Sequence, residues 1–269
     1  MNSVKLSIIT VNLNNLEGLK RTYESVVCQT FTDYEWLVID GGSTDGSREF
    51  IEQHQNKFAY WCSEPDKGIY NAMNKGIVRA KGEYLNFMNS GDCFVKKETL
   101  AGVFGEERKV DILYGFAVDR HANGKCEMPC TMKQSISWYD LYSETFPHQS
   151  SFIKRSMFTI VGLYEENCKI VADWKWFVMA LLNYGASYEF VPHKIAVIQP
   201  DGISCSMDCS LERQQQRKYL FPSYIANEDA INLTNLSIVQ SNRLTCLLFK
   251  IIKVLAMQIR LVKMLFLLR

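Results

Sequence analysis

Short runs of apolar, often β-branched residues alternate with longer stretches of helical periodicity over the first 118 residues. Runs of the first kind are typical of buried strands, and stretches of the second kind are typical of helices. We predict strands at 6–13, 35–40, 58–63, 83–89 and 111–118, and helices at 16–27 and 69–80. Asn14 or Asn15 is the predicted N-cap of the first helix. This alternation favours βαβ units, a largely parallel sheet and therefore an α/β fold.

The pattern changes after residue 118. Asn123 and Gly124 form a pair suited to a tight hairpin turn, so the topology is expected to become more antiparallel. Beyond this turn, we predict helices at 137–144 and 173–184, and strands around 148–154, 187–191 and 194–198.

The C-terminal tail, from Leu244 to Arg269, is rich in large apolar residues but is interrupted by basic ones. It contains no uninterrupted apolar stretch of the ~20 residues needed to cross a bilayer. On a helical wheel the apolar side lies opposite one broad basic sector, made of Lys250, Lys253, Arg260 and Lys263. An amphipathic helix of this kind is typical of a helix that lies on an anionic membrane surface. The alternative is a helix packed on the protein itself or on a second subunit.

Composition and charge narrow the classes of function. The 269 residues are 47% hydrophobic and 22% charged, which is ordinary for a globular protein. Thirty basic and 29 acidic residues give a formal charge of +1, which offers no support for nucleic acid as the main partner. The nine cysteines are odd in number, and no secretory segment is recognised ahead of the first strand, so a cytoplasmic location is expected. Two C-x-x-x-C pairs are compatible with a zinc site or with idle thiols: Cys126 with Cys130, and Cys205 with Cys209.

Small polar and acidic residues follow each of the first four predicted strands. In an open α/β sheet, ligands bind beyond the carboxyl ends of the strands, so these turns are the places where chemistry is expected. Each turn alone has a plain explanation as a chain reversal. Neither a G-x-G-x-x-G fingerprint nor a phosphate-binding loop of the ATPase kind is present, so a nucleotide would be held in another way. The first strand ends in Thr10, Asn12 and Asn14, and the next three end in Asp40 to Ser47, Glu64 to Gly68, and the sequence NSGD from Asn89 to Asp92.

These turns also carry a family resemblance. The segments SIITVNLNN, VIDGGSTDGS and EPDKGIYNAMNKGIVRAKGEYLNFMNSGD, followed by HQSSFIK and VADWKWF, resemble the family 2 glycosyltransferases, in particular the subgroup that builds bacterial surface polysaccharides. The resemblance covers roughly residues 5–204. It implies a GT-A fold with a mostly parallel, Rossmann-like sheet flanked by helices, a nucleotide-sugar donor, a divalent metal and inversion at the anomeric carbon. We accordingly divide the chain into a catalytic domain at 1–210, with a donor half to about 118 and an acceptor half beyond it, and a helical extension at 211–269.

The resemblance also implies roles for donor-binding residues. Thr10 and Asn12 lie where the family contacts the nucleoside, and Asp40 lies where a carboxylate accepts hydrogen bonds from the base or ribose. Asp66, with Lys67 beside it, falls where the family places another acid near the nucleotide. Each acid has a structural alternative: Asp40 as a turn or helix-capping residue, and Asp66 as a β-turn residue.

The NSGD turn departs from the family pattern. The usual D-x-D motif binds a metal that bridges the donor's two phosphates, but here Asn89 and Gly91 occupy the positions of the two acids, with Ser90 between them. Asp92 is then the one charged candidate in this turn for holding Mn²⁺ or Mg²⁺. Mg²⁺ often binds through one or two carboxylates, substrate phosphates and water, so a single acid is chemically reasonable.

The general base is implied at Asp173, at the start of a predicted helix, where an N-cap is the alternative role. His148, with Gln149 beside it, is expected near the acceptor or the phosphates, although a structural histidine is an equal alternative. Trp174 is a candidate for stacking on an acceptor sugar; it and Trp176 point in different directions on a helix, so at least one belongs to the core. Residues 201–204 lie where relatives close a loop over the diphosphate.

The resulting hypothesis is an inverting glycosyltransferase that moves a hexose-type sugar, most simply from a UDP-sugar, to a lipid-linked oligosaccharide or polysaccharide precursor. It would work as a peripheral protein on the cytoplasmic face of the membrane. One alternative is a nucleotidyltransferase acting on sugar phosphates, although the glycine-rich basic loop typical of such enzymes is missing after the first strand. The other is a catalytically decayed scaffold attached to the membrane.

Overall fold

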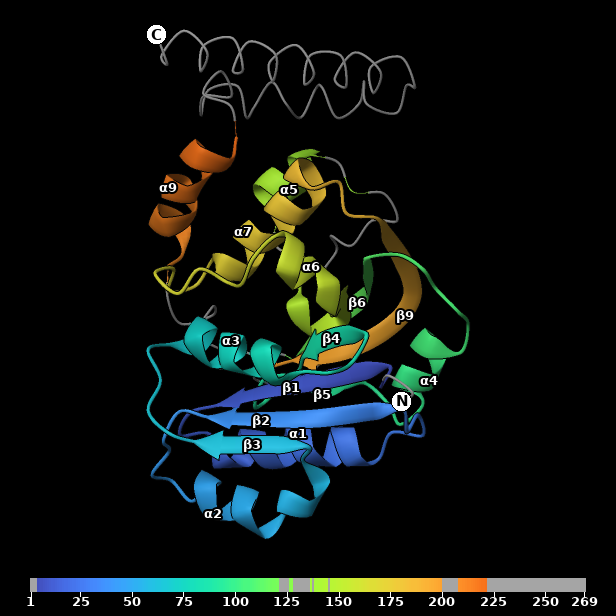
Figure 1. The fold of residues 1–269 in the computed structure, drawn as a ribbon, viewed down its shortest axis with the longest axis vertical. Helices are drawn as coiled ribbons and strands as arrows, with labels where there is room; N and C mark the ends of the chain where they lie inside the picture. Colours follow the sequence, from blue (N-terminus) through green and yellow to red (C-terminus); the bar gives the residue numbers. More distant parts are fainter. Residues whose placement is uncertain are drawn as a thin grey trace, which may run out of the picture.

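The structure is a computed structural model that describes residues 4–120, 126–127, 136, 138–144, 146–199 and 208–221. Within these residues, the strands form one nine-stranded mixed sheet in the order β3-β2-β1-β4-β8-β6-β9-β5, with β7 paired to β6 (Figure 1). The predicted α/β fold is confirmed, and so is the parallel pairing of the first strands. The predicted hairpin turn at 123–124, the closing loop at 201–204 and the tail at 244–269 lie outside the described residues.

The first half of the sheet is parallel. Strand β1 (Leu6–Asn12) lies between β2 (Tyr34–Asp40) and β4 (Tyr84–Phe87), and β3 (Tyr60–Ser63) adds to the outer edge of β2. Since parallel strands end at the same edge of a sheet, their pairing brings Asn12 beside Asp40, and Asp40 beside Ser63. The polar strand ends predicted from sequence therefore converge at one edge.

Helices cover both faces of the parallel half (Figure 1). On one face, α1 (Leu16–Val27) buries Leu19 and Val26, and on the other α3 (Ile69–Arg79) buries Tyr70 and Met73. Successive residues of β1 alternate between these two cores, as expected for a strand buried on both sides. Asn15 is the N-cap of α1: its side chain accepts a hydrogen bond from the Gly18 N–H at 3.0 Å.

The second half of the sheet is mixed. Strand β8 (Ser151–Lys154) pairs antiparallel with both β4 and β6 (Ile112–Arg120), and β9 (Tyr188–Ile198) pairs parallel with β6. The short strands β5 (Cys93–Phe94) and β7 (Cys126–Glu127) pair antiparallel with β9 and β6. The predicted change to antiparallel pairing after residue 118 is therefore confirmed.

Two predicted strands, at 187–191 and 194–198, are in fact the single strand β9. Pro192 lacks an N–H, and the register of β9 with β6 shifts between Phe190 and Lys194, so the strand bulges there instead of ending. Gly115 on β6 accommodates the bulge, because a Cβ at this position would lie 2.7 Å from the His193 carbonyl oxygen.

Helices and turns of the second half also differ in detail from the sequence prediction. The strand expected at 148–154 begins only at Ser151, because His148–Ser150 forms the 3-10 turn η2 after Pro147. The helix expected at 173–184 is α7 (Ala172–Val178) continued by a π-helical segment, η3 (Met179–Asn183). The helix expected at 137–144 is α5 (Trp138–Ser143). The sequence prediction missed α2 (Ser47–Gln53), η1 (Gln55–Lys57), α4 (Thr99–Phe104) and α6 (Arg155–Ile160), whereas α9 (Ser210–Leu220) lies at the start of the predicted helical extension.

Helix α9 begins at the predicted boundary between catalytic domain and extension and packs on the acceptor half. Its Arg213 guanidinium lies 5.0 Å over the Trp174 ring, and its Arg217 donates to the Tyr142 carbonyl oxygen at 2.6 Å. No helix in the described part of the chain combines the length and the apolar character needed to cross a bilayer.

Candidate active site

The NSGD turn follows β4 and is fixed by helix α1. The Thr22 hydroxyl donates to the Asp92 carbonyl oxygen at 2.7 Å and accepts from the Gly91 N–H at 3.0 Å, and the Asn15 amide donates to the Ser90 carbonyl oxygen at 3.1 Å. Gly91 has φ of 108°, a conformation that favours glycine. The run of small polar residues after β4 is therefore a turn whose shape is set by glycine and by two polar residues of α1.

Asp92 points from this turn toward the acceptor half. Its carboxylate, in a residue that is 7% exposed, accepts hydrogen bonds from the Gln149 side chain at 3.0 Å and from the Gln199 N–H at 3.1 Å. These partners lie on η2 and just after β9, so Asp92 joins the two halves of the molecule.

The surroundings of Asp92 are compatible with a divalent metal. Among the residues described, no group of three or more His, Cys, Asp and Glu side chains is placed to hold an ion. The Asp92 carboxylate is a hard ligand that suits Mg²⁺ or Mn²⁺, and such ions take their other ligands from nucleotide phosphates and water. Asp92 fits a metal that arrives with the donor, not one enclosed by protein side chains.

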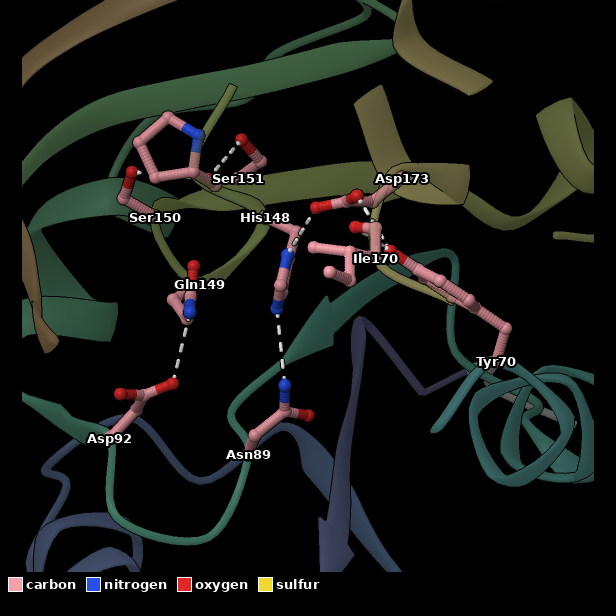
Figure 2. A network of polar contacts seen from close by, with 10 residues as sticks. Tyr70, Asn89, Asp92, His148, Gln149, Ser150, Ser151, Ile170 and Asp173 are labelled. Atoms are coloured by element: carbon pink, nitrogen blue, oxygen red, sulfur yellow. Dashed lines mark hydrogen bonds and ion pairs between the residues drawn. The ribbon is translucent and has the colours of Figure 1, made fainter. Parts of the chain in front are cut away.

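A chain of hydrogen bonds crosses the site from the NSGD turn to helix α7 (Figure 2). The Asn89 Nδ2 lies 3.1 Å from His148 Nε2, and His148 Nδ1 lies 2.9 Å from Asp173 Oδ2. The other carboxylate oxygen, Asp173 Oδ1, accepts from the Tyr70 hydroxyl at 2.9 Å. Tyr70 also contacts the Ile170 carbonyl oxygen closely. The structure thus brings together Asn89, His148 and Asp173, three residues proposed from the sequence.

Asp173 is held in its charged form. Burial alone would raise the pKa of this carboxyl, but hydrogen bonds from His148, the Tyr70 hydroxyl and the Trp174 backbone outweigh it and lower the pKa below its ordinary value. The pKa of Tyr70 is raised by burial and by the charge of Asp173, so its hydroxyl stays protonated and remains a donor. Asp173 is not the N-cap of α7, because that cap is Val171 and the Asp173 side chain turns to His148 and Tyr70 instead.

Asp40 lies at the end of β2 in a dense network. Its Oδ1 accepts from Asn12 Nδ2 at 2.7 Å and from the Ser43 hydroxyl at 2.6 Å; its Oδ2 accepts from the Ser63 hydroxyl at 2.6 Å and the Ser43 N–H at 2.9 Å. Burial would raise the pKa of Asp40, but the hydrogen bonds from Ser43, Ser63 and Asn12 lower it overall. The carboxylate is therefore the turn-forming residue that the sequence offered as an alternative. Contact between Asp40 and a nucleoside stays a prediction.

The other residues predicted to bind the donor differ in burial: Thr10 is buried, whereas Asp66 and Lys67 lie in a turn nearer the surface. Thr10 is fully buried, and its hydroxyl donates to the Met88 carbonyl oxygen at 2.8 Å and accepts from the Trp36 indole at 2.9 Å, which ties β1 to its neighbours. Asp66 Oδ1 accepts from the Gly68 N–H at 2.9 Å, as in the predicted turn, and Lys67 is exposed. The Thr10 hydroxyl therefore presents no surface to a nucleoside in this structure.

Trp174 does not line an acceptor pocket here. It is 1% exposed, and its indole donates to the Leu141 carbonyl oxygen at 2.7 Å. Trp176 is buried as well and donates to the Gly162 carbonyl oxygen. The expectation that at least one tryptophan belongs to the core is confirmed, and the stacking role for Trp174 is not supported, because both indoles find their partners inside the protein.

Sequence reasoning missed Tyr70, Thr22 and Gln199 as parts of the site. Tyr70 lies 103 positions before Asp173 in the chain, so no local pattern links the two. Thr22 lies on the buried face of α1, in helical register with Leu19 and Val26. A polar residue at such a core position is the sequence signal that could have identified it as part of the site.

A mixed α/β sheet with polar strand ends beside a buried His–Asp pair has the arrangement of an α/β enzyme that binds its ligand at the carboxyl ends of the strands. The family model described as "Glycosyl transferase family 2" matches residues 7–158. The chain belongs to this family and is a glycosyltransferase with a GT-A fold.

Individual proteins support this assignment. The "PGL/p-HBAD biosynthesis glycosyltransferase" of Mycobacterium bovis is 30% identical over 187 residues, which cover 66% of this chain and 70% of that protein. Staphylococcus aureus TarS 1-349, solved with UDP-GlcNAc, superposes with a TM-score of 0.65 at 20% identity, over 80% of this chain and 65% of that chain. The mannosyltransferase PcManGT of Pyrobaculum calidifontis, solved with GDP-Man and Mn²⁺, gives 0.55 at 17% identity, over 74% of this chain and 58% of that chain. The match thus spans less than two thirds of either solved chain.

Proposed function

We propose that the protein is an inverting glycosyltransferase that moves a hexose-type sugar from a UDP-sugar to a lipid-linked oligosaccharide or polysaccharide precursor. The observation that carries this proposal is the chain of hydrogen bonds from Asn89 through His148 to Asp173. It joins the turn where the family binds the donor's diphosphate to the residue where the family places its general base.

The donor side rests on the convergent strand ends. Asn12 and Asp40 lie side by side at the carboxyl edge of the parallel half, where open α/β sheets bind nucleotides. The fold likeness to a protein solved with UDP-GlcNAc favours a uridine donor. A Mn²⁺ or Mg²⁺ ion held by Asp92 and the donor phosphates would offset the charge that grows on the departing diphosphate.

The chemical step needs a base on the side of the sugar opposite the diphosphate. The acceptor hydroxyl attacks the anomeric carbon from that side while the bond to the phosphate oxygen breaks, so a single displacement inverts the configuration. The buried pair of His148 and Asp173 supplies the basic group, since Asp173 is ionised and hydrogen-bonded to the ring.

The acceptor and the membrane contact rest on two weaker supports. One is the amphipathic, basic sequence of residues 244–269, which suits the surface of an anionic bilayer on its cytoplasmic side. The other is a relative that is named for PGL/p-HBAD biosynthesis. Both favour an acceptor that is presented at a membrane.

The test is release of nucleoside diphosphate from defined donors. The full chain is incubated with Mn²⁺ and, separately, with UDP-glucose, UDP-galactose, UDP-N-acetylglucosamine and GDP-mannose, with Asp173→Asn protein as the matched control. We expect release of UDP from at least one UDP-sugar by the wild-type protein and not by the variant. Absence of both binding and turnover for every donor would contradict the proposal. Preferential turnover of GDP-mannose would show that the donor is a guanosine and not a uridine nucleotide sugar.

A further inference from the structure

This inference rests on the proposed function and sharpens its chemistry. We propose that the atom that takes the proton from the acceptor hydroxyl is Nε2 of His148, and that Asp173 is a positioning residue that holds the histidine ring and stabilises its charge. The family resemblance places the base at Asp173 itself, so the geometry assigns the proton to a different side chain.

Asp173 is poorly placed to meet an acceptor directly. The residue is 6% exposed, and its two carboxylate oxygens are directed at the Tyr70 hydroxyl and at His148 Nδ1. A general base must come within hydrogen-bond reach of the hydroxyl that it deprotonates. Figure 2 shows that His148 stands between Asp173 and the NSGD turn, so a sugar held at that turn would face the imidazole before it faced the carboxylate.

The hydrogen bonds fix which ring nitrogen is basic. An ionised carboxylate only accepts hydrogen bonds, so the contact with Asp173 Oδ2 places the ring hydrogen on Nδ1. At Nε2 the neighbour is Nδ2 of Asn89, which only donates. Two donors would repel one another, so Nε2 carries a lone pair in this structure. The ring is therefore a neutral imidazole whose free lone pair points toward the donor side.

Asn89 marks the place of the acceptor hydroxyl. Its amide hydrogen occupies the position from which a hydrogen approaches the Nε2 lone pair. Among the residues described, no group bonds to Asn89 Oδ1, although this atom is buried. Turning the amide toward a bound donor therefore breaks no bond at Oδ1, and it leaves the lone pair of Nε2 to the hydroxyl.

The step balances without any further reagent. The acceptor oxygen forms a bond to the anomeric carbon, and the bond from that carbon to the phosphate oxygen breaks, with its electron pair leaving on the nucleoside diphosphate. The hydroxyl proton passes to His148 Nε2. The imidazolium so formed is paired with the Asp173 carboxylate, and it returns the proton to solvent after product release.

Replacement of His148 by Asn separates the two assignments. In His148→Asn the side-chain amide keeps a donor for Asp173 Oδ2 but removes Nε2. We expect kcat for UDP release, measured with whichever donor the wild-type protein uses, to fall by about 10²–10⁴-fold with little change in KM for the donor. Exposed His193, on the strand bulge and outside the site, provides the matched control His193→Asn, for which kcat stays at the wild-type value.

Chemical rescue adds a readout that a structural role would not move. We expect added imidazole to restore turnover in His148→Gly but not in Asp173→Gly. Retention of wild-type kcat in a folded His148→Asn would overturn the inference, because Asp173 would then take the proton itself. That result in an active wild-type protein leaves the proposed function standing, so the two failures are distinguishable.

A measurement on the wild-type protein needs no variant to be active. Long-range ¹H–¹⁵N spectra of the protein at pH 8 report the tautomer of each of the four histidines, and comparison with His148→Asn or His148→Gln assigns the signal. We expect a protonated Nδ1 and a bare Nε2 at His148. A ring protonated at Nε2 and bare at Nδ1 would overturn the inference.

Discussion

The two halves of the sheet use buried polar residues in different ways. In the parallel half, Asp40 receives hydrogen bonds from Asn12, Ser43 and Ser63, all of which end or follow neighbouring strands, so the network is local to one sheet edge. In the mixed half, Asp173 is reached by His148 and Tyr70 from separate segments. Among the described residues each network leaves one buried amide oxygen without a partner, Asn12 Oδ1 in the first and Asn89 Oδ1 in the second, so the two networks differ in reach along the chain and not in satisfaction. We call the Asp40 network, with Asn12, Ser43 and Ser63, the donor platform. We call the Asp173 network, with His148 and Tyr70, the acceptor wall. The comparison indicates that the donor platform is built from one sheet edge, whereas the acceptor wall is assembled by the tertiary fold.

The largest effect is expected at Asp173. Asp173→Asn replaces the carboxylate that accepts from His148 Nδ1 with an amide that can present a donor to the ring, which favours the wrong tautomer. By analogy with the serine protease triad, we expect kcat to fall by about 10³–10⁴-fold with the fold retained. Nucleoside diphosphate release and circular dichroism check the two parts. Unchanged turnover in Asp173→Asn would remove Asp173 from the chemical step, whereas unchanged function of the variant in cells would support a decayed scaffold.

The next effect is expected at Asp92, which joins the two halves. Asp92→Asn keeps a group of the same shape but removes the charge that would hold a divalent ion. We expect turnover at a fixed Mn²⁺ concentration to fall by about 10²-fold and to recover in part at higher Mn²⁺, because the ion stabilises the leaving diphosphate by several kcal/mol. A titration of activity against Mn²⁺ measures this. An unchanged Mn²⁺ dependence would remove Asp92 from the metal site.

A smaller effect is expected for Tyr70→Phe, which changes the acceptor wall without removing a charge. It removes the hydroxyl that donates to Asp173 Oδ1 and contacts Ile170. Since that bond lowers the pKa of Asp173, its loss raises this pKa, so the ionised carboxylate that positions His148 is lost at a higher pH and the acid limb of the kcat profile moves the same way. We also expect a loss of about 1 kcal/mol in the free energy of unfolding. A kcat–pH profile that is identical to that of the wild type would show that Tyr70 does not tune Asp173.

Ser63→Ala tests the donor platform, where the effect is on stability. The folded-state pKa of Asp40 is lowered, so its network stabilises the protein above the unfolded pKa of about 3.9 and loses this contribution as pH falls below it. Removing the Ser63 hydroxyl should cost about 1 kcal/mol at pH 7. Urea unfolding at pH 7 and pH 3 should show a smaller cost at pH 3, and an equal cost at both would contradict the linkage.

The contrast between the halves also explains what could be predicted from the sequence. The parallel half repeats one local rule, a buried strand followed by a polar turn, and both the strands and Asp40 with its neighbours follow from it. The hydrogen bonds that link Tyr70, Asp173 and His148 join positions that only the tertiary fold brings together. The sequence therefore pointed to His148 and Asp173 as single candidates, but it did not predict the contacts between them. The sequence predicted two strands in place of β9, because a proline such as Pro192 usually ends a strand. In the structure a bulge opposite Gly115 allows the pairing with β6 to continue past this proline.

The central claim is that a base on the acceptor wall drives a single displacement at the donor platform. The most direct test is the configuration of the product formed from an α-linked UDP-hexose with methanol as surrogate acceptor. The anomeric proton of the methyl glycoside in the ¹H NMR spectrum identifies that configuration, and a methyl glycoside does not mutarotate. The account predicts the β-glycoside. Formation of the α-glycoside would contradict it, because retention requires a different route through the site.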